Sequence, residues 1–134
     1  MALADKTRLR LLNLMRGDEV CVCFFTEVLE ESQPKISRHL AYLRNAGIVE
    51  ARRDGKWMHY RIVRPESAFA EQILEDTLDW LGSQAEMQRD YQKLADACCA
   101  PSAPVAIMRA TKPNTLAKPD MRFEEKEELE TYLL

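Results

Sequence analysis

Four cysteines, in two close pairs, are the residues of this 134-residue chain with the most evident chemistry. Cys21 and Cys23 are one residue apart in EVCVCFF, and Cys98 and Cys99 are adjacent. No apolar run approaches a membrane span, and MALADKTRLRLL carries charges where a signal sequence needs an apolar centre, so we expect a cytoplasmic protein. In that reducing compartment the pairs favour soft-metal ligation or thiol chemistry over structural disulfides.

The spacing of Cys21 and Cys23 limits how the two thiols act together. Residues two apart on a regular helix point to nearly opposite sides. Their sulfurs therefore reach one ion only if the backbone around Val22 is extended or frayed, which the start of a helix allows. The alternative is that both residues are buried small hydrophobes. Cys98 and Cys99 either complete the first pair's site or form their own, and the sequence leaves both readings open.

The elements that position the first pair are predicted to be helical. Asp5 is a suitable N-cap for a helix that runs to about Arg16 and ends at Gly17. Its apolar positions Leu9, Leu12 and Met15 recur at helical spacing. The first cysteine pair is then expected at the entry to a short helix that ends near Glu31.

The next predicted helix, Gln33–Asn45, has an apolar side and a basic, polar side. Ser32 is a good N-cap, Pro34 suits the first turn, and Gly47 follows the end. The expected buried stripe consists of Ile36, Leu40 and Leu43. The opposite side carries Lys35, Arg38, Ala41 and Tyr42.

Residues 48–62, IVEARRDGKWMHYRI, predict a basic β-hairpin. Two strand-like runs flank Asp54-Gly55, a pair that tolerates the positive φ of a two-residue turn. Helix, turn, helix and hairpin is the order of a winged helix-turn-helix. We therefore expect a mainly α protein with a small β-hairpin.

Two further helices are predicted at 66–81 and 83–100, separated by Gly82. Ser83 and Glu86 form a capping box that starts the second. The apolar stripes are expected at Phe69, Ile73, Leu74, Thr77, Leu78 and Leu81 in the first helix and at Met87, Tyr91, Leu94 and Ala95 in the second. The four prolines between 101 and 119 indicate a linker, followed by an acidic end.

The charge of the chain is unevenly distributed. The formal net charge is −3, yet residues 1–62 carry 11 Lys/Arg against 8 Asp/Glu, and residues 63–134 carry 8 against 14. The excess of positive charge is sharpest within residues 33–61. A local basic face on an acidic protein indicates a surface that binds a polyanion.

That basic segment fits the major groove of DNA. The groove admits one α-helix, whose N-terminal half reads base edges with side chains such as those in SQPKISRHL. Arg52, Arg53 and Lys56 around the hairpin turn are then expected to reach phosphates or the minor groove. The alternative is that these are solvated charges. The sequence shows no nucleophile-base-orienter set and no phosphate-binding glycine loop, so we do not expect an enzyme.

ADKTRLRLLNLM and CVCFFTEVLEESQPKISRHLAYLRNAGIVEARRDGKWMHYRI together resemble the ArsR/SmtB family of metal-responsive winged-helix repressors, especially its arsenical-resistance branch. The resemblance covers residues 3–62 closely and 63–81 loosely. It implies a homodimer that binds inverted-repeat operator DNA when metal-free and releases it when metal binds. It places DNA contacts at Gln33, Lys35, Ser37, Arg38 and His39, and dimer contacts largely in helices outside the winged core. The family's additional N-terminal helix is almost absent.

From the resemblance we expect one folded domain followed by a tail. Residues 1–100 are expected to form the winged helix-turn-helix DNA-binding and dimerisation domain. Residues 101–134 are expected to be a Pro-containing linker and a poorly ordered acidic tail.

The resemblance also implies an inducer. Trivalent arsenic and antimony are thiophilic and prefer three thiolates. The family's third thiolate falls at Thr26, so a third ligand comes from Cys98 or Cys99, from solvent or a small thiol, or is not needed, as for methylarsenite.

The expected function is repression of a metalloid-resistance operon. The repressor is expected to leave its operator on binding As(III) or Sb(III), inorganic or methylated. The expected ligands are Cys21, Cys23, Cys98 and Cys99. No catalytic cofactor is expected. The alternatives are a cadmium- or lead-responsive repressor using the same thiolates and a thiol redox-sensing regulator. Zinc sensing is disfavoured because the two histidines, His39 and His59, lie on the recognition helix and the wing.

Overall fold

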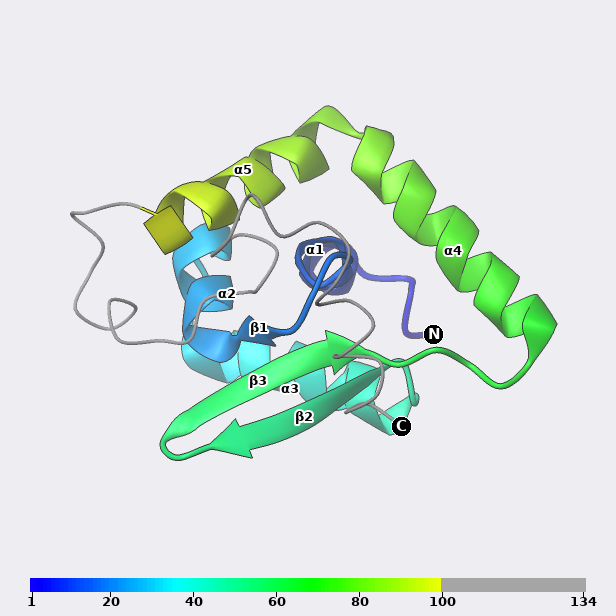
Figure 1. Ribbon diagram of the computed structural model, residues 1–134, viewed down its shortest axis with the longest axis horizontal. Coiled ribbons are helices and arrows are strands. Elements are labelled where there is room, and N and C mark those ends of the chain that lie inside the picture. The colour runs from blue at the N-terminus through cyan, green and yellow to red at the C-terminus, as the bar shows by residue number, and fades with distance from the viewer. Residues whose placement is uncertain (100–134) are drawn as a thin grey trace, which may run out of the picture.

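The computed structural model describes the backbone of residues 1–99 and the side chains as far as Cys98. It contains five helices and three strands within that range (Figure 1). In chain order they are α1 Lys6–Leu14, β1 Val20–Cys21, α2 Val22–Leu29, α3 Gln33–Asn45, β2 Val49–Asp54, β3 Trp57–Ile62, α4 Ala68–Ser83 and α5 Ala85–Cys99. The mainly α fold with a small hairpin is confirmed, and the linker and tail predicted for 101–134 lie outside the described residues.

Helix α1 begins as expected but ends earlier. The Asp5 carboxylate accepts a hydrogen bond from the backbone N–H of Arg8 at 3.0 Å. The helix stops at Leu14, and Met15 closes it by donating its backbone N–H to the carbonyls of Leu11 and Leu12. The helix was predicted to run to about Arg16, so it ends two residues earlier than expected, because the last turn closes locally before the chain turns toward β1.

Helices α2 and α3 form the helix-turn-helix. Helix α2 ends at Leu29, and its C-cap Glu30 has a φ of 55°, in the left-handed region. Ser32 caps α3 by accepting the backbone N–H of Lys35, as predicted. The predicted stripe of α3 is confirmed, since the structure buries Ile36, Leu40 and Leu43 completely.

The sheet has a third strand that the sequence did not predict. The strand order is β1-β3-β2, with both pairings antiparallel. The hairpin turn is shifted by one residue from the predicted Asp54-Gly55, because Asp54 pairs with Trp57 and leaves Gly55 and Lys56 as the loop. Gly55 supplies the positive φ of 59° that this tight turn needs.

The junction between α4 and α5 also differs from the prediction. Gly82 lies inside α4, and the break comes at Gln84, whose backbone is extended. The predicted capping box was wrong, because the Ser83 hydroxyl donates to the carbonyl of Trp80 and does not cap α5. A Cβ at position 82 would meet only the guanidinium end of Arg16, an exposed and flexible side chain that can move aside.

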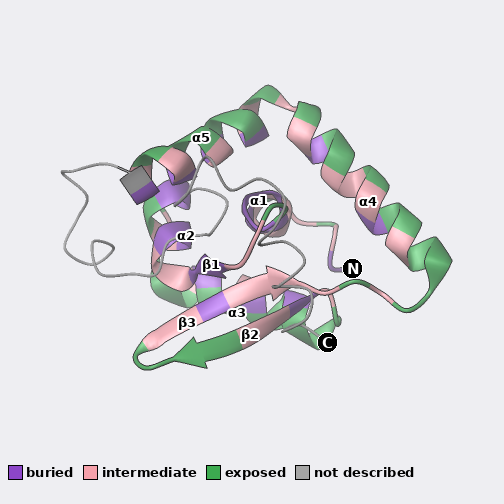
Figure 2. Cartoon of the chain, in the orientation of Figure 1, coloured by how far each residue is buried: buried purple, intermediate pink, exposed green. Residues whose placement is uncertain are grey.

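The predicted apolar stripe of α4 is buried only in part. Leu74 and Leu81 are buried, whereas Phe69 is 86% exposed and Ile73 is 60% exposed. Figure 2 shows the exposed and half-buried surface that runs along α4. The physical reason is that α4 packs on α1 and α5 along one narrow side and extends away from the winged core (Figure 1).

Helix α5 is attached to α1 by polar contacts as well as by apolar packing. Arg10 donates two hydrogen bonds to Asp90, at 2.7 and 2.9 Å, and the Asp90 side chain is 4% exposed. Asn13 donates its amide to the carbonyl of Met87 at 2.9 Å. Within residues 1–99, no helix has the length and apolar character needed to cross a membrane.

Candidate thiol site and nucleic-acid interface

The structure brings the sulfurs of Cys21 and Cys23 to 3.3 Å. Cys21 is both the last residue of β1 and the N-cap of α2, with an extended backbone at φ −70° and ψ 141°. This is the extended helix start that the spacing required. Two sulfurs bound to one ion at about 2.3 Å each are at most about 4.6 Å apart, so this pair is close enough to chelate one.

The two thiols are chemically unequal. Cys21 is fully buried and Cys23 is half-buried. The Cys23 thiol donates a hydrogen bond to Cys21, which lowers the pKa of Cys21 to about 7 against the opposing effects of burial and Glu19. The same hydrogen bond, together with burial, raises the pKa of Cys23. Because the thiolate is the metal ligand and nucleophile, Cys21 is the reactive member of the pair near neutral pH.

The described residues hold no preformed third thiolate. The Thr26 hydroxyl donates to the carbonyl of Cys23 at 2.9 Å. Cys98 is buried in the same core cluster as Cys21, on α5 where this helix packs against α2 (Figure 1). No group of three His, Cys, Asp or Glu suited to a metal occurs among these residues. That Cys98 and Cys99 bind the ion stays a prediction. The side chain of Cys99 is not among those that the structure describes.

The predicted DNA-reading side of α3 faces solvent at most of its positions. Among its side chains that can hydrogen-bond to DNA, the exposed ones are Gln33, Ser37, Arg38 and Tyr42. Lys35 is half-buried and pairs with Glu31 at 2.7 Å, and His39 Nδ1 lies 3.6 Å from an oxygen of Asp5.

Arg8 of α1 adds a positive charge beside this surface, because its guanidinium stacks 4.0 Å from the ring centroid of Tyr42. Sequence reasoning missed this residue. The sequence gives little indication of this contact, because Arg8 belongs to α1 and Tyr42 belongs to α3.

The wing presents its basic residues unequally. Arg53 and Lys56 are exposed at the hairpin end, where the Lys56 ammonium lies 5.1 Å from the Trp57 ring centroid. Arg52 is held by Glu19, whose carboxylate accepts its Nη2 at 2.5 Å and its Nε at 3.1 Å. Of the three predicted wing contacts, Arg52 is therefore the one in an ion pair within the described residues, while Arg53 donates its Nε to the carbonyl of Gly55 at 3.3 Å. Sequence reasoning also missed Glu19, which lies immediately before β1 and two residues before Cys21.

His59 is buried in the wing, as expected. It is 1% exposed, and burial lowers its pKa against the opposing effect of Glu19. Its Nδ1 lies 3.8 Å from a Glu19 oxygen, and its Nε2 finds no hydrogen-bond partner among the described residues. In the strand register it is directly opposite Cys21 on one side and Arg52 on the other.

Comparison with known proteins agrees with this arrangement. Residues 5–51 match the family described as "Bacterial regulatory protein, arsR family". Over 105 residues the chain is 44% identical to the arsenic resistance transcriptional regulator ArsR1 of Pseudomonas putida, covering 78% of this chain and 80% of that protein. The chain belongs to the ArsR family. It is 41% identical over 99 residues to the arsenical resistance operon repressor of Escherichia coli, covering 73% and 83% of the two chains.

A solved structure supports the fold of this ArsR-family protein. HlyU of Vibrio cholerae superposes with a TM-score of 0.53 at 31% identity, over 62% of this chain and 86% of HlyU. The chain is therefore a winged helix-turn-helix DNA-binding transcriptional regulator, and its relatives are regulators rather than enzymes.

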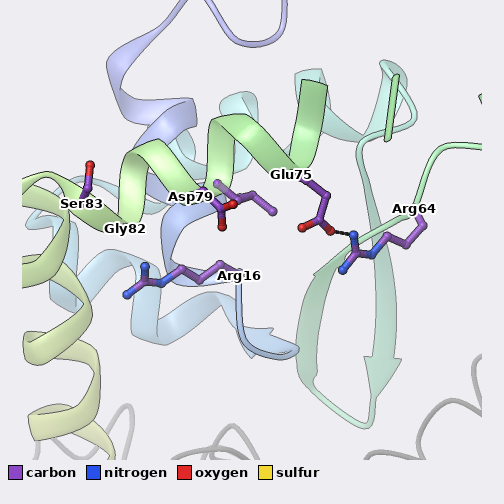
Figure 3. Close-up of a pocket in the computed structure, with 7 residues that line it drawn as sticks. Arg16, Arg64, Glu75, Asp79, Gly82 and Ser83 are labelled. Atoms are coloured by element: carbon purple, nitrogen blue, oxygen red, sulfur yellow. Dashed lines mark ion pairs between the residues drawn. The ribbon is translucent and has the colours of Figure 1, made fainter. Parts of the chain in front are cut away.

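A cavity of about 450 Å³ elsewhere on this regulator has a different character (Figure 3). Arg16 and Arg64 line it together with Glu75 and Asp79. Arg64 pairs with Glu75, as the dashed line in Figure 3 marks, and its Nη1 lies 3.7 Å from Glu71. The charges largely cancel, and no cysteine lines the cavity, so it is suited neither to DNA nor to a thiophilic ion.

Proposed function

We propose that this ArsR-family protein represses a metalloid-resistance operon and leaves its operator when trivalent arsenic or antimony binds Cys21 and Cys23. The observation that carries the proposal is the 3.3 Å approach of the two sulfurs at the first residue of the helix-turn-helix, where the pKa of Cys21 is lowered to about 7. The naming of the 44% and 41% identical relatives for arsenic and arsenical resistance supports it.

The proposed inducer suits two thiols. Trivalent arsenic is a soft acid that prefers thiolate over oxygen ligands. Two thiols that replace two hydroxyls of arsenous acid release two waters, and a methylated trivalent arsenical needs no third sulfur. Cys98 and Cys99 remain proposed ligands, either as a third donor through the contact of α5 with α2 or as a second site.

In the proposed complex, α3 lies in the major groove. Gln33, Ser37 and Arg38 are exposed and reach the base edges, with Tyr42 beside them. Arg53 and Lys56 contact phosphates, which strengthens binding without reading sequence. Lys35 and His39 are proposed contacts that first exchange their present partners Glu31 and Asp5. Arg52 is a proposed phosphate contact that keeps its pairing with Glu19, since 54% of its side chain is exposed.

Release follows from where the thiols lie. Cys21 has no exposed surface, so an ion bound there displaces packed atoms at the junction of β1 and α2. Helix α2 supports α3, and its displacement moves the reading helix out of register with the groove. To count as allosteric, this change must weaken operator binding by about 1–3 kcal/mol.

The proposed repressor is a homodimer formed through α4. Phe69, Ile73 and Trp80 are exposed on this helix, at 86%, 60% and 56%. Ile73 and Trp80 also line a groove with Leu3 and Leu9. A two-fold dimer matches an operator with inverted repeats, because each protomer then reads one half-site.

The direct test measures binding to DNA from upstream of the protein's own gene, with and without arsenite. Wild-type protein is expected to lose about fivefold to 150-fold in affinity. Cys21→Ser and Cys23→Ser variants are expected to bind this DNA and to remain bound in arsenite. A Cys98→Ser/Cys99→Ser variant then shows whether the second pair contributes, and a parallel cadmium titration examines the alternative inducer. A wild-type complex that persists when arsenite occupies both early thiols would refute the proposal.

A further inference from the structure

One row of side chains crosses the sheet from the thiol site to the wing. Cys21 on β1 is directly opposite His59 on β3, and His59 is directly opposite Arg52 on β2. Directly opposite residues of antiparallel strands lie on the same face, with Cβ atoms about 4.5–5.5 Å apart. Cys21 and His59 are both fully buried, so the row is packed and a displacement at one member is felt by the next.

Glu19 connects the two ends of this row. Its carboxylate accepts two hydrogen bonds from the Arg52 guanidinium, from Nε at 3.1 Å and from Nη2 at 2.5 Å. One of its oxygens also lies 3.8 Å from His59 Nδ1. The Glu19 side chain is 21% exposed and that of Arg52 is 54% exposed, so the geometry with two donors, rather than burial, is what fixes this pair. Glu19 is also only two residues before Cys21, and any movement of β1 carries both.

From this geometry we propose that Glu19 is a positioning residue that couples occupancy of the Cys21–Cys23 pair to the placement of the wing. The inference rests on the proposed function and adds a second route from the thiols to DNA, beside the one through α2 and α3. Glu19 holds Arg52 in place. Because Arg52 belongs to β2, this contact fixes the position of β2 relative to β1 across the intervening strand β3.

The route has a clear physical basis. An ion entering beside the buried Cys21 sulfur forces β1 and β3 apart or shifts one along the other. Either movement changes the separation between Glu19 and Arg52, because Glu19 directly precedes β1 and Arg52 lies on β2, and these are the two outer strands of the sheet. Arg53 is next to Arg52 on β2 but on the opposite face, so it keeps its access to phosphate in both states.

The experiment compares the ratio of operator dissociation constants with and without saturating arsenite in Glu19→Gln, Arg52→Gln and the double variant. Each single substitution is expected to reduce the wild-type ratio about threefold or more while leaving arsenite stoichiometry at the thiols unchanged. The double variant is expected to show no greater loss than either single variant, because both remove one link. Far-ultraviolet circular dichroism checks folding, and Arg52→Gln tests the link even if Glu19→Gln disturbs β1.

Arg53→Gln is the matched control, since it removes an adjacent wing charge outside the row. Its operator affinity is expected to fall equally with and without arsenite, so its ratio stays at the wild-type value. The inference is overturned if the Glu19 and Arg52 variants keep the wild-type ratio, or if Arg53→Gln lowers the ratio as much as they do. Failure of the proposed function looks different, because wild-type protein itself would then show a ratio of one.

Discussion

A single hydrogen bond between thiols decides the reactivity of the Cys21–Cys23 pair. Cys23 donates and Cys21 accepts, so negative charge is stabilised on Cys21 and disfavoured on Cys23. The reactive sulfur is also the fully buried one, while its neighbour Cys23 is half-buried and therefore more accessible from solvent. We infer that Cys23 meets an incoming arsenical first and that the Cys21 thiolate completes the chelate.

The lowered pKa of Cys21 predicts a titration near neutral pH. In a Cys98→Ser/Cys99→Ser background, the ultraviolet absorbance of thiolate should rise by one thiol per chain as the pH increases through about 7. Below that pH the thiolate is lost, because the shift is downward from the ordinary cysteine value. Adding Cys23→Ala should move the midpoint upward through loss of the thiol donor, and adding Cys21→Ser should abolish the step. A step that persists without Cys21 would contradict the assignment.

At the scale of elements, the recognition helix depends on its cap and its buried stripe. Ser32 satisfies a backbone N–H at the start of α3, and Ile36, Leu40 and Leu43 fasten the helix to the core. This leaves the exposed side free to carry residues chosen for DNA. Stability and recognition are therefore separable along this helix.

Replacing the cap tests that separation. Ser32→Ala should lower the free energy of unfolding by about 1 kcal/mol, because an N–H in the first turn loses its acceptor. Urea denaturation measures the change. Ser37→Ala, on the exposed side of the same helix, is the control and should stay within about 0.5 kcal/mol of wild type. Equal losses in the two variants would show that the cap is not the source.

The attachment of α5 to α1 rests on two ion pairs of different depth. Asp90→Asn should destabilise the protein by about 2–3 kcal/mol, somewhat below the cost for a fully buried pair, because Arg10 keeps 21% exposure. Glu86→Gln removes the parallel but exposed pair with Lys6, at 3.1 Å, and should cost about 0–1 kcal/mol. Thermal unfolding of both variants makes the comparison. A similar loss in both would mean that burial does not strengthen the Arg10–Asp90 contact.

At the scale of the whole molecule, the described chain leaves an apolar surface uncovered on α4. Phe69, Ile73 and Trp80 lie on the helix that extends away from the winged core, while the wing and α3 lie on another side (Figures 1 and 2). A second copy joined through α4 would leave both DNA-reading surfaces accessible. In such a dimer, assembly and DNA binding use different surfaces of the same protomer.

The dimer is tested by placing charge on this surface. Ile73→Glu should shift sedimentation equilibrium toward monomer and weaken operator binding, because a charge in an apolar interface is costly to desolvate. Lys93→Gln changes the net charge by the same amount at an exposed position of α5 and should leave the dimer intact. An unchanged dimer in Ile73→Glu would place the interface elsewhere.

Local patterns were sufficient for the winged core and for the thiol pair. The helix α3 and the hairpin can be predicted from the sequence alone. Their signals are the cap Ser32, the apolar stripe of α3 and the turn glycine, which all act on neighbours within a few residues. The same applies to Cys21 and Cys23, because two residues of spacing require an extended helix start if their sulfurs are to meet. The sequence also carried the resemblance to the ArsR family, which the comparisons confirm.

Tertiary structure alone decided the contacts between distant segments. The two-residue strand β1 exists because β3 pairs with it, and the Glu19–Arg52 link forms because a hairpin 33 residues away returns to the same face. The exposure of Phe69 and Ile73 likewise depends on how far α4 extends beyond α1, not on its own periodicity. Caps and stripes are local properties of a chain, whereas pairing and burial are properties of two segments at once, and only the folded molecule brings those segments together.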